Sequence, residues 1–394
     1  MPASTRMRTS SASPWLVLLI GAAAFAGPIS PPPGPVSPTG KTIGESEPRV
    51  LISALPVTIS VSGSYYLGGD LEGTGGITIA ASDVTIDMAG FSVDAGPGAV
   101  GDGIASVGSD TNISVFNGSI SGWPGDGVDL SSASNCLLTD LTSNNNTLDG
   151  FVLGANSTMV RCTASGNGGS GIGGSDSGKV SHSTASENGA HGVSLGDGAT
   201  IESSEASGNG GDGFSVGEGS TISLSTGSRN KFGFRVGAGG LVVDSAAIGN
   251  DGDGFIVDSA VQVRACNATG NTGTGIRAGR SATVMDCTSG ANGLNGILLG
   301  HGAVARGNAV RDNDEHGVAV EDGTVGAIVE RNQAFNNKGV GFFVQGIRCL
   351  TFSNAASANG NDYQLRGDGS FGAITDVAGD GAFSLTNSYA NLRY

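Results

Sequence analysis

The sequence predicts an all-β fold, a single-stranded right-handed parallel β-helix of about 12–13 coils with a cap at each end. Three observations predict it: glycines recur at a nearly constant spacing, apolar residues keep step with them, and asparagines occupy a third fixed position in the repeat. The composition agrees, because 70 of the 394 residues are glycine and only 5% are aromatic. Glycine costs roughly 1 kcal/mol at each interior helix position, so helical bundles are disfavoured.

One glycine opens the main strand of each unit, and we call it the repeat glycine. The spacing of consecutive repeat glycines is nearly constant from Gly150 to Gly317, and the units before and after this stretch are slightly longer. The repeat glycines are Gly103, Gly127, Gly150, Gly171, Gly192, Gly213, Gly233, Gly254, Gly275, Gly296, Gly317 and Gly341. Self-similarity at a fixed period of this length is the signature of a solenoid. Equivalent glycines, such as Gly254 and Gly275, are therefore expected to stack along one axis.

An apolar residue stands one position after each repeat glycine, and another stands three positions after most of them, as in Phe255 and Val257. A spacing of two predicts a strand with one buried face. The residue between them should point outward, and in the later coils this position forms an unusual strip. We call it the outer strip: Arg235, Ile256, Arg277, Leu298, Ala319 and Phe343. Apolar patches of this kind mark contact surfaces, so we expect either a partner or the C-terminal segment to cover it. The segment offers Phe383, Leu385, Tyr389, Leu392 and Tyr394 for burial.

Asparagine recurs four positions before most repeat glycines, for example at Asn271 and Asn292. Stacked coils lie about 4.8 Å apart, so these amides should form a hydrogen-bonded column. Small residues occupy another column, which includes Cys266 and Cys287. These two cysteines, one repeat apart, are expected to be adjacent, and a disulfide between them is left open. The other three cysteines, Cys136, Cys162 and Cys349, form no metal-binding pattern.

The N-terminus predicts export. Arg6 and Arg8 precede an apolar run that ends in a small-residue cleavage site at residues 24–26, and this run is too short to span a membrane. We therefore expect a signal peptide over 1–26, a proline-rich linker over 27–48, an N-terminal cap over 49–76, the β-helix over 77–370 and a C-terminal capping segment over 371–394. The predicted location is secreted or extracytoplasmic, with no transmembrane anchor in the mature chain.

The unit I-x-x-N/C-x-A-x-x-N-x-x-x-G-I-x-L resembles the right-handed parallel β-helix repeat family of the pectate-lyase-like superfamily. The resemblance extends over roughly Ile77 to Leu365, and residues 84–91 are similar to the opening coil of many members. It implies the fold strongly and the activity weakly, because the superfamily includes polysaccharide lyases, hydrolases, epimerases, tailspikes and adhesins. Pectate lyases of this superfamily use an arginine base with aspartate-bound calcium. The resemblance thus makes Asp286, Arg306, Asp312 and Arg331 a conceivable site, with scattered surface ion pairs as the alternative.

The best acid–base candidates stand directly before repeat glycines: Asp126, Asp149, His191 and Asp212. Stacking should place Asp126 near Asp149 and His191 near Asp212, and two close carboxylates raise one pKa and suit glycoside chemistry. The alternative is that Asp-Gly and His-Gly are simply favourable turn dipeptides. Three contiguous residues, 314–316, carry potential metal ligands, but neighbours on a turn rarely converge, so no metal site is expected.

The net charge is −16, and it becomes −18 once two arginines leave with the signal peptide. Nucleic acid is therefore excluded as a partner. We expect a non-catalytic surface or carbohydrate-binding scaffold that contacts a polysaccharide or cell-surface partner. The alternative is a polysaccharide lyase or glycoside hydrolase acting in a lateral groove. Ligand-binding candidates are Trp123, on a longer unit, with Arg235, Arg277 and Phe343. No cofactor is expected, although calcium remains open.

Overall fold

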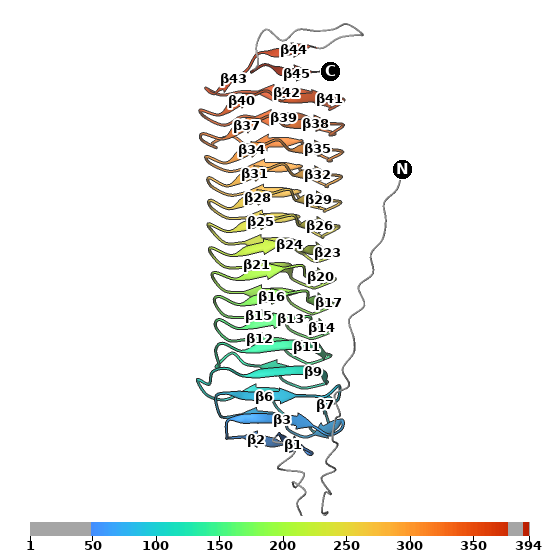
Figure 1. Ribbon diagram of the computed structural model, residues 1–394. Coiled ribbons are helices and arrows are strands. Elements are labelled where there is room, and N and C mark those ends of the chain that lie inside the picture. The colour runs from blue at the N-terminus through green and yellow to red at the C-terminus, as the bar shows by residue number, and fades with distance from the viewer. Residues whose placement is uncertain (1–48, 377–388, 394) are drawn as a thin grey trace, which may run out of the picture. The chain divides into compact units, whose positions relative to one another are not determined.

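The computed structural model describes residues 49–376 and 389–393 of the chain. The expected signal peptide and linker lie outside these residues. Every regular element in the described ranges is a β-strand, and they contain no helix long and apolar enough to cross a membrane. The strands stack coil upon coil from β1 towards β45 (Figure 1). The predicted all-β parallel solenoid is thus confirmed.

One sheet, which we call sheet B, contains one strand from each of fifteen coils, and neighbouring strands pair in parallel. Its strands are β2 (Val57–Ile59), β5 (Ile77–Ile79), β8 (Ile104–Ser106), β10 (Val128–Asp129), β12 (Phe151–Leu153), β15 (Ile172–Gly174), β18 (Val193–Leu195), β21 (Asp212–Val216), β24 (Phe232–Val236), β27 (Phe255–Val257), β30 (Ile276–Ala278), β33 (Ile297–Leu299), β36 (Val318–Val320), β39 (Val340–Val344) and β42 (Asn361–Leu365). From β8 to β39, these are the strands that the repeat glycines open.

The second sheet, sheet A, consists of two columns of parallel strands that the long strands β9 (Ser114–Ser121) and β11 (Leu137–Asn144) join. The other strands of the first column are β1 (Val50–Ile52), β3 (Gly63–Leu67), β6 (Val84–Asp87), β13 (Thr158–Val160), β16 (Lys179–Ser181), β19 (Thr200–Glu202), β22 (Thr221–Ser223), β25 (Leu241–Val243), β28 (Gln262–Arg264), β31 (Thr283–Met285), β34 (Val304–Arg306), β37 (Ile328–Glu330), β40 (Leu350–Phe352) and β43 (Ser370–Phe371). The other strands of the second column are β4 (Leu71–Gly73), β7 (Ser92–Ala95), β14 (Thr163–Ser165), β17 (Thr184–Ser186), β20 (Glu205–Ser207), β23 (Thr226–Ser228), β26 (Ala246–Ile248), β29 (Asn267–Thr269), β32 (Thr288–Gly290), β35 (Ala309–Arg311), β38 (Gln333–Phe335), β41 (Ala355–Ser357), β44 (Ile374–Asp376) and β45 (Asn391–Arg393).

The fifteen strands of sheet B exceed the 12–13 coils expected from the repeat. The additional strands are β2 and β5 before Gly103, and β42 after Gly341. The glycine position is Pro56 before β2 and Asp362 in β42, whereas β5 follows a glycine, Gly76, that the repeat count omitted. Strands β1–β4, in the segment expected to be an N-terminal cap, pair in parallel with the coil that follows.

The predicted register is confirmed along both marker columns. Phe255 pairs with Ile276, which pairs with Ile297, so the glycines before them are also stacked. The asparagine column runs without a break from Asn146 to Asn359, and its members are buried up to Asn337. Each Nδ2 donates to the Oδ1 of the next coil over most of its length, as Asn271 does to Asn292 at 3.0 Å.

The core is a thin stack of side chains that alternate inward along each strand. Phe214, Phe234 and Phe255 lie ring upon ring inside sheet B, with centroid separations of 4.9 and 4.7 Å. In-register stacking brings identical positions together, so one large side chain per coil fills the interior repeatedly. This arrangement explains how a chain with few aromatic residues builds a continuous core.

The predicted adjacency of Cys266 and Cys287 is confirmed. The backbone N–H of Cys266 donates to the Sγ of Cys287 at 3.4 Å. The two sulfurs are not joined by a disulfide, and all five cysteines are free and buried. Their column continues as asparagine at Asn308 and Asn332, a second amide ladder that the sequence analysis did not identify.

The prediction that the C-terminal segment covers the outer strip is wrong for the described part of that segment. Strand β43 pairs with β40, and β45 pairs with both β41 and β44, so these residues extend sheet A, whereas the strip belongs to sheet B. The last coil of sheet A otherwise has unpaired N–H and C=O groups, and strand pairing satisfies them. Phe383, Leu385 and Tyr394 lie outside the described residues, while Tyr389 is exposed beside Phe352.

Candidate functional site

Two columns of side chains flank the repeat glycines on the outside of sheet B. The first, which we call the pre-glycine column, includes Asp102, Asp126, Asp149, Ser170, His191, Asp212, Phe232, Asp253, Thr274, Asn295, His316 and Val340. The second is the outward position of each strand, which becomes the outer strip from Arg235 onward. The strip residues other than Ala319 are at least partly exposed, and none belongs to the hydrophobic cluster of the core. The predicted outward orientation of these side chains is therefore correct.

Acids and histidines of the pre-glycine column support the backbone of the next coil. Asp126 Oδ1 accepts the N–H of Asp149 at 2.6 Å, and Asp149 Oδ1 accepts that of Ser170 at 2.5 Å. His191 Nδ1 accepts the N–H of Asp212 at 3.0 Å. These bonds satisfy backbone donors that would otherwise lack partners. The column therefore has a structural role, although through contacts between coils and not through the turn preference expected from the dipeptides.

The predicted pair of Asp126 and Asp149 is brought together, and Asp102 and Asp129 lie close by. No lysine or arginine of the described residues forms an ion pair with these four carboxylates. Burial raises the pKa of Asp126 from its ordinary 3.8 to about 6, and the charges of Asp149, Asp102 and Asp129 add to this effect. Burial also raises the pKa of Asp149. The expected pKa rise is confirmed, but burial contributes more than the like charges.

The ionised Asp126 carboxylate should make the fold weaker at high pH. Because the folded-state pKa lies above the ordinary value, the folded chain binds the proton more tightly, and stability falls as the pH rises from about 4 through about 6. We expect Asp126→Asn to be more stable than the wild type by about 1 kcal/mol at about pH 8, a figure discounted for solvent screening, and to lose this advantage at about pH 4. Urea unfolding at both pH values measures the difference.

A control of opposite sign is available at Asp140. Its hydrogen bond and ion pair with Arg161 hold the pKa of that carboxyl below its usual range. Asp140→Asn should therefore gain no stability at high pH. Equal responses of the two variants to pH would contradict the assignment for Asp126.

The arginines of the outer strip are paired diagonally with the pre-glycine column. Arg235 Nε donates to Asp212 Oδ2 at 2.8 Å, and Arg277 Nε donates to Asp253 Oδ2 at 2.6 Å. Each arginine belongs to the coil after its aspartate. The arginine side chains are 46% and 45% exposed, whereas the aspartates are 5% and 7% exposed. The buried acids thus hold the guanidinium groups at the surface, which accounts for arginine at alternate positions of the strip.

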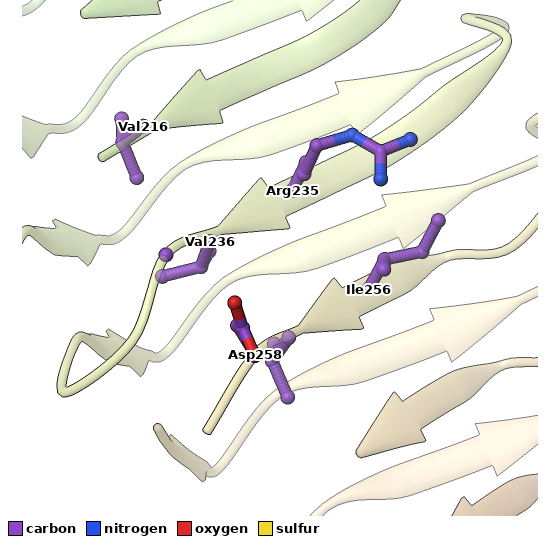
Figure 2. Close-up of a pocket in the computed structure, with 7 residues that line it drawn as sticks. Val216, Arg235, Val236, Ile256 and Asp258 are labelled. Carbon is purple, nitrogen blue, oxygen red and sulfur yellow. The ribbon is translucent and has the colours of Figure 1, made fainter. Parts of the chain in front are cut away.

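Two adjoining hollows lie where the strands of sheet B end. The first, about 320 Å³, is lined by Val216, Arg235, Val236, Gly237, Ile256, Val257 and Asp258. Figure 2 shows Arg235 and Ile256 on the adjacent strands β24 and β27, with Asp258 just beyond the end of β27. The second, about 290 Å³, is lined by Val257, Arg277, Ala278, Gly279, Leu298, Leu299, Gly300, Glu321 and Thr324. Val257 is common to both, and we call the combined feature the strip groove.

Glycines line this groove after three of the strands. The position four places after a repeat glycine is itself glycine at Gly237, Gly279 and Gly300, where a Cβ would meet backbone atoms of the preceding coil. The same position carries Asp258 and Glu321 in two other coils, and both acids line the groove. The sequence analysis did not identify these two residues. An acidic residue at this repeat position, where several other coils have glycine, was the sequence feature that could have identified them.

A family model described as right handed beta helix region matches residues 102–248, 172–302 and 225–357, which together cover more than half of the chain. The chain belongs to the right-handed β-helix family. The match confirms the right-handed parallel β-helix fold that the resemblance implied. No curated protein matches its sequence.

Solved structures share the fold at low identity. The right-handed β-helix is 14% identical to the A-module of mannuronan C-5 epimerase AlgE4 from Azotobacter vinelandii, with a TM-score of 0.50 over 72% of this chain and 89% of that one. The AlgE6 A-module from the same organism is also 14% identical, with a TM-score of 0.48 over 76% and 90%. The Dettilon tailspike protein is 13% identical, with a TM-score of 0.42 over 65% and 59%. These likenesses concern the fold alone.

The two aromatic candidates for ligand binding lie in different environments. Trp123 is fully buried, and its Nε1 donates to the backbone oxygen of Val93 at 3.1 Å. This corrects the expectation that Trp123 meets a ligand, because its ring fills the core of the long early coils. Phe343 is partly exposed and stacks on His316, with centroids 4.2 Å apart.

Of the residues suggested by analogy with pectate lyases, Asp286, Arg306 and Arg331 lie in consecutive coils at the end of the first column of sheet A, where the N–H of Asp286 donates to the backbone oxygen of Arg306 at 3.1 Å, whereas Asp312 follows the second column. Arg306 pairs with Glu330, a residue not considered in the sequence analysis, in place of an aspartate. Asp286, Asp312 and Arg331 have positive φ and lie at bends outside the strands. Among residues 314–316, Asp314 forms an ion pair with Lys338. No group of three metal-binding side chains occurs in the part of the chain described here.

Proposed function

We propose that this protein is an exported β-helix that binds carbohydrate without transforming it, through the strip groove of sheet B. The observation that carries the proposal is the makeup of the groove. Along the axis, the guanidinium groups of Arg235 and Arg277, which buried aspartates hold in place, alternate with the aliphatic side chains of Ile256 and Leu298. Glycines also line the groove. Sugars present hydroxyl groups at their edges and C–H groups on their faces, so a surface of this alternating kind suits them.

The regular coil length supports a binding role over a catalytic one. Repeat glycines keep a nearly constant spacing from Gly150 to Gly317, and these coils carry no long insertions that could wall in a substrate. Catalytic sites exclude water to strengthen their electrostatic interactions, whereas the groove is shallow and open. The structure of the mannuronan epimerase module shares the fold only, so the proposal depends on the groove and not on that likeness.

In our proposal, this binding takes place outside the cytoplasm. Residues 1–26 have the charge and hydrophobicity pattern of a signal peptide, and residues 27–48 have the composition of an extended tether. A β-helix that is secreted, at the cell surface or in the periplasm would contact a polysaccharide or a cell-surface partner.

The binding role predicts the effect of substitutions in the strip. We expect Arg235→Ala and Ile256→Thr each to weaken glycan binding by about 10-fold, the equivalent of about 1.4 kcal/mol. Calorimetric titration with neutral and anionic glycans measures the affinity, and size-exclusion chromatography of the glycan afterwards shows whether it has been cut. The matched control is Arg264→Ala, because Arg264 is an exposed arginine on sheet A.

Two outcomes separate this role from folding defects. Arg235→Ala removes the cation beside the buried Asp212, so its unfolding transition is measured in parallel. Ile256→Thr leaves that ion pair intact and tests the groove alone. If the variants of the strip and the Arg264 control bind equally well, the strip groove is not the binding site.

A second candidate function is supported by Asp126. A half-buried carboxyl with a pKa of about 6 beside Asp149 can serve as a general acid near neutral pH, as a polysaccharide lyase or glycoside hydrolase requires. Incubation with pectate, alginate and neutral glycans, with and without calcium, tests it. Glycan shortening that Asp126→Asn abolishes would replace the binding proposal with the enzymatic one.

A further inference from the structure

We infer that the strip groove takes a neutral, linear glycan that lies along the axis of the β-helix, an inference that rests on the proposed carbohydrate-binding function. The direction comes from the shape of the groove. Its lining extends from Val216 on β21 to Glu321 just after β36, which is six consecutive strands of sheet B. At about 4.8 Å per coil, the groove is about 24 Å long along the axis. A rod of this length matches an extended polymer and not a single small molecule.

The charge balance excludes a polyanion as the preferred ligand. The two arginines of the groove are each neutralised by a buried aspartate, Asp212 or Asp253. Asp258 and Glu321 then leave the groove with two negative charges in excess. A uronate chain would meet repulsion from Asp258 and Glu321 unless it displaced the buried aspartates from their arginines.

The hydrogen-bonding groups instead suit hydroxyls. The Nε–H of each arginine is committed to an aspartate, which fixes the plane of the guanidinium and leaves its terminal N–H groups as donors. Asp258 and Glu321 are exposed acceptors in the same groove. A sugar hydroxyl donates and accepts at once, so it can join an arginine donor to a carboxylate acceptor. Ile256 and Leu298 lie between these polar groups and offer apolar surface to the faces of the rings.

The test compares neutral and acidic oligomers that are long enough to span the groove. The probes are linear glucan, mannan and galactan oligosaccharides on one side, and alginate and pectate oligosaccharides on the other, titrated into the full chain at about 0.02 M and about 0.5 M salt. We expect at least one neutral oligomer to bind with an affinity that changes less than about twofold with salt, because no net charge is neutralised. Uronate oligomers should bind at least about 10-fold more weakly.

Variants of the two acids sharpen the comparison. The double variant Asp258→Asn with Glu321→Gln should weaken binding of the neutral glycan about 10-fold, because bonds to charged acceptors are the stronger ones. The same variant should improve uronate binding by removing two negative charges. The control is Asp322→Asn, because Asp322 is exposed beside Glu321 but does not line the groove.

The outcomes separate the two proposals. Salt-sensitive binding of a uronate in preference to every neutral oligomer overturns this inference and leaves the carbohydrate-binding function intact. Binding of no oligomer of either class overturns both. If Arg264→Ala weakens binding of the neutral glycan as much as Arg235→Ala does, the strip groove is not the binding site in either proposal.

Discussion

Replacing Asn271 by alanine is expected to lower the free energy of unfolding by about 3–5 kcal/mol, because it opens the buried amide ladder on both sides. The Asn271 side chain makes four hydrogen bonds. Its Nδ2 donates to Ala247 O and Asn292 Oδ1, and its Oδ1 accepts from the N–H and Nδ2 of Asn250. Alanine leaves the backbone groups of Asn250 and Ala247 buried without these partners. Each such loss costs about 1–3 kcal/mol.

Asn267 provides the matched control within the same coil. It is half-exposed on β29, and its side chain accepts one hydrogen bond from Thr269 Oγ1 at 2.6 Å. Asn267→Ala should change the free energy of unfolding by no more than about 0.5 kcal/mol. Urea unfolding followed by far-ultraviolet circular dichroism measures both variants. If the two substitutions lower the free energy of unfolding by similar amounts, the amide ladder stabilises the fold no more than ordinary surface hydrogen bonds do.

Replacing the repeat glycine Gly254 by alanine should cost about 3 kcal/mol, which is the upper range for overpacking a tight interior. A Cβ at this position would lie 2.6 Å from the backbone oxygen of Gly275 and 2.8 Å from Nδ2 of Asn271. The first of these is backbone of the next coil and cannot move without shifting the strand pairing. The substitution therefore strains sheet B and the amide ladder together.

The absence of space, and not a positive φ, explains this glycine. Gly254 is not among the glycines with left-handed backbone, so alanine is excluded by its neighbours alone. Gly69 is the control, since a Cβ there would meet nothing within 4 Å. Thermal unfolding should show a large fall in the midpoint for Gly254→Ala and almost none for Gly69→Ala. An equal tolerance of both substitutions would contradict the tight stacking of repeat glycines.

Sequence analysis predicted the features that the repeat itself carries. The stacked glycines, the column from Asn146 to Asn337 and the contact of Cys266 with Cys287 all follow from one rule. Parallel strands in register place equal repeat positions next to each other, whatever the residues are. The proximity of Asp126 to Asp149 and the outward direction of the strip follow from the same rule.

The parts that break the repeat were predicted poorly. Trp123 stands four positions before Gly127, which is the position of the asparagine column, and its N–H donates to Asn146 Oδ1 at 3.0 Å, so the repeat position indicated a burial that the sequence analysis missed. Of the early coils, that of β2 has Pro56 at the glycine position, and that of β5 has Gly76 there but no asparagine four places earlier, so the number of coils was underestimated. The described parts of the C-terminal segment extend sheet A and do not cover the strip, because open strand edges attract strands more strongly than an outward apolar position does.

The sequence by itself determined the fold, the register and which residues share a column, because a constant period with alternating apolar residues has one consistent solution in parallel strands. Only the tertiary structure decided how neighbouring columns meet. The pairing of Arg235 with Asp212 joins different repeat positions of successive coils, and the strip groove is lined by the outer strip together with the residues that follow the strands. Such diagonal contacts depend on the twist between coils and on side-chain rotamers, which a one-dimensional repeat does not contain.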